Sequence, residues 1–186
     1  MGKLAEEDSK YRIFKETFPS EIISIIGSLS AGIILTILIL PFESFPILIL
    51  MIPAVLSLRG NISSPFCARV SKDLILGEFD LRSLGENVLA TLFLSLISSL
   101  IIGILSYMVN IFLVSFPLLS FGHFLLIPII SLIINLGISI PVTIILNYVA
   151  FKSGLNPNNV LPLITSIGDL LSVLSFFFSL IILNIP

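Results

Sequence analysis

Residues 160–183 read VLPLITSIGDLLSVLSFFFSLIIL and contain a single charged side chain, that of Asp169. About 20 consecutive apolar residues are enough for a helix to cross the ~30 Å hydrocarbon core of a bilayer. The stretch has this length and lacks the strict alternation of a barrel strand, so it predicts a transmembrane α-helix. Comparable runs predict five spans in all, at about Ile22–Leu40, Phe45–Val70, Asn87–Phe112, Phe124–Phe151 and Val160–Leu183.

The composition of the 186 residues agrees with this prediction. Hydrophobic residues make up 56% of the chain and charged residues only 11%, against about 25% charged residues in soluble domains. The mean hydropathy is +1.19. These values exclude a disordered chain, a nucleic-acid binder and an ordinary water-soluble enzyme. The expected fold class is therefore an all-α, polytopic membrane protein, and its single cysteine allows no intrachain disulfide.

The basic residues of the connecting segments predict the orientation. Residues 1–20 are interpreted as a cytoplasmic segment, either an interfacial helix or a partly ordered tail, ahead of a transmembrane domain at 21–186. Phe18-Pro19-Ser20 is interpreted as a break and an N-cap before the first span. Lysine and arginine occur only in alternate connections, so we expect a cytoplasmic N-terminus and an outer C-terminus in a multi-pass plasma-membrane protein. The basic residues are Lys3, Lys10, Arg12, Lys15, Arg69, Lys72, Arg82 and Lys152.

Asp169 is the strongest candidate for function. It lies nine residues into the fifth span, roughly 13 Å deep at ~1.5 Å per residue, where a charge costs several kcal/mol unless it meets protein or water. Thr165 and Ser172 share its helix face, and Ser166 lies near that face. This polar stripe predicts a water-filled ion path. The alternative is a carboxyl group that is protonated or bonded to a neighbouring helix.

The second span carries the other charge at membrane depth, Arg59, followed by Gly60 and Asn61. Pro53 and Pro65 predict a broken or kinked helix, whose freed carbonyl groups, with Asn61, could serve as oxygen ligands or anchor water. The alternative is a plain proline kink with Arg59 reaching toward the cytoplasmic surface. In the fourth span, Asn135 is explained as well by interhelical hydrogen bonds as by a place on the path.

Two stretches resemble the MgtE magnesium transporters and their eukaryotic solute-carrier relatives. Residues 53–69, with Leu58-Arg59-Gly60-Asn61 at their centre, are similar to the second span of that family, and residues 156–169 are similar to its last span. The resemblance implies a homodimer or two paired halves, with the pore on the two-fold axis between the second and fifth spans. By position, Asp169 of each half would hold the transported Mg²⁺, and Gly60 and Asn61 would shape the path.

Bacterial members of that family have Gly-Gly-Asn where this chain has Arg59-Gly60-Asn61. A fixed positive charge near a cation path repels the ion unless an acid balances it. We therefore expect Arg59 to pair with a cytoplasmic-side acid or with a carbonyl group, as a charge-pairing or gating residue.

The functional prediction is a divalent cation channel or transporter for Mg²⁺, without a bound cofactor and without nucleic acid as a partner. One cysteine and one histidine argue against a dedicated zinc or copper site. A proton- or sodium-coupled carrier that uses Asp169, and a membrane-embedded assembly subunit, stay open as alternatives. Gly168-Asp169 also echoes intramembrane aspartyl proteases, whose chemistry needs two carboxylates, so we predict that the chain is not an enzyme.

Overall fold

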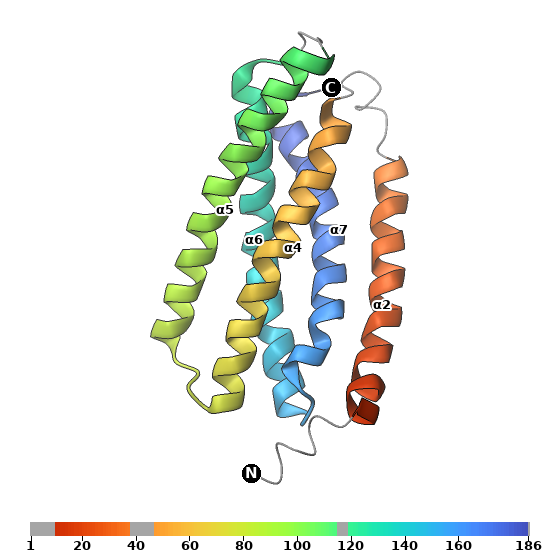
Figure 1. Cartoon of the computed structure of the whole chain (residues 1–186), viewed down its shortest axis with the longest axis vertical. Coiled ribbons are helices and arrows are strands. Elements are labelled where there is room, and N and C mark those ends of the chain that lie inside the picture. The colour runs from red at the N-terminus through yellow and green to blue at the C-terminus, as the bar shows by residue number, and fades with distance from the viewer. Residues whose placement is uncertain (1–9, 38–46, 115–118, 186) are drawn as a thin grey trace.

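The computed structural model describes residues 10–37, 47–114 and 119–185, and this part of the chain is helical (Figure 1). A π-helical turn, η1 (Asn110–Val114), follows α5, and a 3-10 turn, η2 (Pro157–Val160), precedes α7. Five of the helices are long and apolar enough to cross a membrane, which confirms the all-α, five-span prediction. They are α2 (Lys10–Ile37), α4 (Ile47–Leu76), α5 (Leu81–Val109), α6 (Phe121–Lys152) and α7 (Leu161–Ile182).

The first span begins earlier than the sequence predicts. Helix α2 runs through Pro19 without interruption, so the prediction of a break and an N-cap at Phe18-Pro19-Ser20 is wrong. Proline removes one backbone donor from a helix. The Ser20 hydroxyl donates to the Glu16 carbonyl oxygen at 3.4 Å, a bond back into the helix rather than an N-cap. Residues 1–9 and residues 38–46, which include the connection between the first two predicted spans, lie outside the described residues.

Helix α4 is likewise continuous from Ile47 to Leu76, through both Pro53 and Pro65. The chain therefore does not break at these prolines. Each of them removes one backbone donor, and membrane helices tolerate that loss where neighbouring helices are packed against them.

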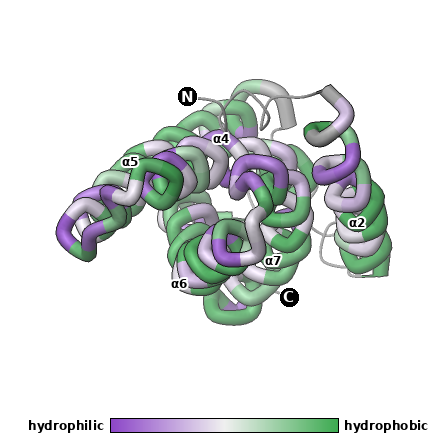
Figure 2. The backbone as a smooth tube through the Cα atoms, turned by 90° about the horizontal axis from the view of Figure 1, so that it is seen from below, coloured by the Kyte–Doolittle hydropathy of each residue, from purple (hydrophilic) through white to green (hydrophobic). Residues whose placement is uncertain are grey.

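Helix α7 lies at the centre of the arrangement and contacts α2, α4 and α6. It is the most buried of the five spans, and α2, which packs mainly against α7 and η2 at one side of the bundle, is the least buried (Figures 1 and 2). Turns with left-handed glycines at Gly77 and Gly154 end α4 and α6. Polar residues gather at the helix ends on the side viewed in Figure 2.

Two apolar clusters hold the helices together and leave a polar layer between them. One cluster joins Leu48–Val55 of α4 to Phe124 of α6 and Val173–Leu180 of α7, whereas the other contains Phe66, Val70 and Leu74. Along α4, Arg59 falls between the residues of the two clusters. The first cluster packs α4 against α7 on one side of Arg59, and the second packs α4 against α5 and α6 on the other side.

Candidate functional site

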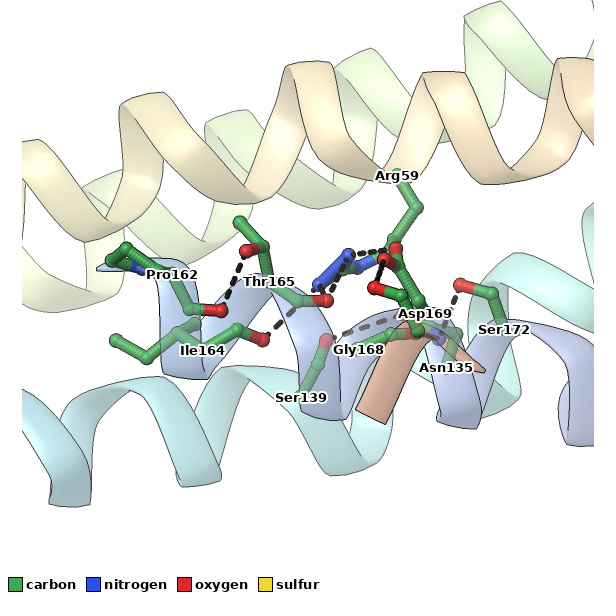
Figure 3. Close-up of polar contacts among 10 residues, drawn as sticks. Arg59, Asn135, Ser139, Pro162, Ile164, Thr165, Gly168, Asp169 and Ser172 are labelled. Atoms are coloured by element: carbon green, nitrogen blue, oxygen red, sulfur yellow. Dashed lines mark hydrogen bonds and ion pairs between the residues drawn. The ribbon is translucent and has the colours of Figure 1, made fainter. Parts of the chain in front are cut away.

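The polar layer contains an ion pair between α4 and α7 (Figure 3). The Arg59 Nη1 atom lies 2.9 Å from Asp169 Oδ1. The Arg59 side chain is 1% exposed and that of Asp169 is 35% exposed. Arg59 is thus enclosed by protein, whereas part of the Asp169 side chain is accessible.

Backbone carbonyl groups of α7 hold the guanidinium as well. Both Nη1 and Nη2 donate to the Thr165 carbonyl oxygen at 2.8 Å, and Nη2 also donates to the Ile164 carbonyl oxygen at 3.2 Å. Charge-assisted bonds of this kind are about twice as strong as neutral ones. Of the four hydrogen bonds that the Arg59 guanidinium donates to α7, three therefore go to backbone carbonyl groups and one goes to the Asp169 carboxylate (Figure 3).

Gly168 provides the space that the guanidinium occupies. A Cβ atom built on Gly168 would overlap the Nη2, Cζ and Nε atoms of Arg59. Any other residue at 168 would push the guanidinium away from the helix. The Nε atom of Arg59 is buried and has no hydrogen-bond partner among the described residues, so the enclosure of this charge is not fully compensated.

The second oxygen of the carboxylate faces the first span. The Ser28 hydroxyl of α2 donates to Asp169 Oδ2 at 3.3 Å, which is long for an O–H donor. The Asp169 carboxylate therefore contacts three helices: its own α7, α4 through Arg59, and α2 through Ser28.

Behind the ion pair, a second polar group joins α6 to α7. The Asn135 amide nitrogen donates to Ser172 Oγ at 3.0 Å and to the Gly168 carbonyl oxygen at 3.4 Å, and Ser139 Oγ donates to Asn135 Oδ1 at 3.3 Å. Asn135, Ser139 and Ser172 are all buried. This network fixes the segment of α7 on which the guanidinium lies.

The structure brings together some of the residues that the sequence predicts and separates others. Arg59, Thr165 and Asp169 are in one cluster, although the Thr165 hydroxyl donates to Pro162 O at 2.8 Å rather than toward the carboxylate. Asn61 is exposed, and the neighbouring Gly60 has open space where a Cβ would stand.

Ser166 is buried at the contact between α7 and α2. A Cβ on Gly27 would overlap the Ser166 hydroxyl, so the two helices approach each other closely at this point. In the single chain, Ser166 therefore faces α2.

Two residues at the site were missed by sequence reasoning. Ser28 is one of the small and polar residues spaced four apart in α2, namely Ser24, Ser28, Gly32 and Thr36. That spacing was the available signal. In the sequence Gly168 stands out only as the neighbour of Asp169, because its role depends on the Arg59 side chain from another helix.

The pairing of Arg59 differs in part from the expectation. It bonds carbonyl groups, as predicted, but its acid is Asp169 at membrane depth rather than a cytoplasmic-side acid. The reason is geometric: α4 crosses α7 with Arg59 opposite Gly168, which places the guanidinium beside the next residue.

The site offers a cation the two oxygen atoms of one partly exposed carboxylate, that of Asp169. No group of three or more His, Cys, Asp or Glu side chains that could hold a metal ion occurs in residues 10–37, 47–114 and 119–185. A metal ion at Asp169 would thus depend on one carboxylate of this chain, together with water, carbonyl groups or a second chain.

Comparison with known proteins gives one match. The family model MgtE, described as a divalent cation transporter, matches residues 52–179, which include Arg59 and Asp169. No curated protein and no solved structure matches the chain.

Proposed function

The chain belongs to the MgtE family of divalent cation transporters, and from this membership we propose that it conducts Mg²⁺ through a path in which Asp169 holds the ion. The family is one of membrane transporters and not of enzymes. The observation that carries the proposal is an aspartate near the middle of the central helix α7 that remains 35% exposed although its partner arginine is enclosed.

The chemistry of Asp169 suits this ion. Mg²⁺ requires near-octahedral oxygen coordination, releases water reluctantly and is usually held by one or two carboxylates that leave several waters in place. A single partly exposed carboxylate at the position of Asp169 supplies one such ligand. We propose that the second comes from Asp169 of another copy, so that the working unit is a homodimer or a pair of half-transporters.

The path would run along the dimer axis between α4 and α7. The exposed Asn61 and the open space at Gly60 support a place for α4 along it, and Thr165 lies one turn from Asp169 on α7. We propose that the buried Asn135, Ser166 and Ser172 hold α7 in position.

We further propose that the N-terminus is cytoplasmic and the C-terminus outside, in the plasma membrane, with a bend of α4 at its prolines. Successive spans reverse direction, so Lys15, Arg69, Lys72, Arg82 and Lys152 all belong to the same end of the bundle. Basic residues on one side are typical of cytoplasmic faces.

The test is Mg²⁺ flux into proteoliposomes that contain the purified chain. We expect Asp169→Asn to abolish flux because it removes the carboxylate charge while keeping an oxygen that Arg59 can bond. Asp80→Asn is the matched control, since Asp80 is an exposed residue before α5 whose side chain makes no capping bond. Flux at the native rate in Asp169→Asn would refute the proposal.

The same vesicles separate the alternatives. Flux that requires a pH or sodium gradient would identify a coupled carrier that uses Asp169. Flux that appears only when a different chain is added would identify a half-transporter or an assembly subunit.

A further inference from the structure

We propose that Arg59 is a built-in competitor for the cation site, which neutralises Asp169 at rest and is exchanged for a divalent ion during transport. The inference rests on the proposed function, because it concerns the affinity and selectivity of the same carboxylate.

The guanidinium is the fixed partner of the pair. It is 1% exposed, lies in the space left by the missing side chain of Gly168, and bonds two carbonyl oxygens of α7 independently of the carboxylate. If Asp169 rotates away, Arg59 keeps three of its four hydrogen bonds. The exchange therefore does not leave the buried guanidinium of Arg59 without hydrogen-bond partners.

The carboxylate is the movable partner. It is 35% exposed, and its only bonds with the described residues are the ion pair through Oδ1 and the long contact of Oδ2 with Ser28. An ion can therefore approach the carboxylate from its exposed side. Turning the carboxylate toward that side breaks one hydrogen bond to Arg59.

Charge then determines which ions can compete. A monovalent cation carries the same charge as the guanidinium but lacks its fixed position and must give up water. A divalent cation has twice the charge, and its attraction to a carboxylate at a given distance is twice as large. Arg59 would thus reduce occupancy by Na⁺ and K⁺ and set a threshold concentration for Mg²⁺.

The experiment measures Mg²⁺ flux as a function of Mg²⁺ concentration for the native chain and Arg59→Gln in proteoliposomes. Glutamine keeps a donor for the Thr165 carbonyl oxygen but removes the charge. We expect the half-saturating Mg²⁺ concentration to fall at least tenfold, and Na⁺ to inhibit the variant but not the native chain. Arg69→Gln is the matched control, because Arg69 is an exposed arginine of the same helix, and it should keep native values.

An unchanged or raised half-saturating concentration in Arg59→Gln would overturn the inference, as would the absence of Na⁺ inhibition. Should Arg59→Gln not fold, Arg59→Lys replaces it. A lysine amine cannot reach both the carbonyl groups and Asp169 with the same geometry, so a lower half-saturating concentration supports the inference and a native value refutes it.

If Asp169→Asn retains flux, the proposed function itself fails. If Asp169→Asn loses flux and the arginine variants behave as native, only the inference fails.

Discussion

Gly168→Ala tests whether the fit between the Arg59 guanidinium and α7 is as close as the structure shows. The new methyl group would occupy the place of the guanidinium and force Arg59 away from its carbonyl and carboxylate partners. Breaking a buried ion pair costs about 3–5 kcal/mol. Replacing glycine by alanine inside a helix returns about 1 kcal/mol. The free energy of unfolding should therefore fall by about 2–4 kcal/mol.

The assay is reversible unfolding in mixed detergent micelles, followed by helical circular dichroism. The same substitution made in an Arg59→Ala background should stabilise the protein by about 1 kcal/mol, because the obstructing side chain is gone and only helix propensity changes. Gly137→Ala is the matched control, since Gly137 is exposed on α6 and a Cβ there meets nothing within 4 Å.

The difference between the two backgrounds is the coupling between residues 59 and 168, about 3–5 kcal/mol by these figures. A Gly168→Ala variant as stable as the native chain would refute the reasoning. An equal loss of stability in both backgrounds would also refute it, since the loss would then have a cause other than Arg59.

Two further variants test the supporting contacts. Asn147→Leu removes the buried oxygen that accepts the Ser71 hydroxyl (2.8 Å) between α4 and α6. The free energy of unfolding in micelles should fall by about 1–3 kcal/mol, while Mg²⁺ flux per folded protein stays the same. Unchanged stability would contradict this prediction. Glu16→Gln weakens the bonds that the carboxylate accepts from Asn156 N (3.2 Å) and Asn159 Nδ2 (2.8 Å) at the start of η2. The loss should be about 1 kcal/mol at low ionic strength and smaller in 1 M salt, and a loss independent of salt would count against a role for the charge.

The fold was largely predictable because a membrane span is a local property of the sequence. Long apolar runs identified five helices, and the described part of the chain contains five helices long and apolar enough to cross a bilayer. The errors occurred where a local signal has more than one outcome. Proline predicts an ended or a kinked helix, and the break expected at Pro19 does not occur, because α2 is continuous through it. Helix α4 is also unbroken at Pro53 and Pro65, where the prediction allowed a break or a kink.

The two charged residues of the candidate site could be predicted from the sequence, but their pairing could not. Burial cost alone identified Arg59 and Asp169 as residues that need partners. That they partner each other depends on how α4 crosses α7, over a separation of 110 residues, and no periodicity encodes such a crossing. The contact between Ser28 and Asp169 depends in the same way on the packing of α2 against α7.

The ion pair at the centre of this protein does not explain its stability. A buried pair loses so much hydration that well-packed apolar residues of similar volume are often equally stable or more stable, by about 1–4 kcal/mol. Two further features of this pair reduce stability. The Arg59 Nε atom has no hydrogen-bond partner among the described residues, and the guanidinium requires a glycine in the interior of α7. A contact whose only role was to join two helices would not require the Asp169 carboxylate to remain 35% exposed. The enclosed guanidinium of Arg59 and the partly exposed carboxylate of Asp169 fit a site in which the carboxylate changes partners. This asymmetry is the physical basis of our two proposals, that Asp169 holds the transported ion and that Arg59 controls its binding.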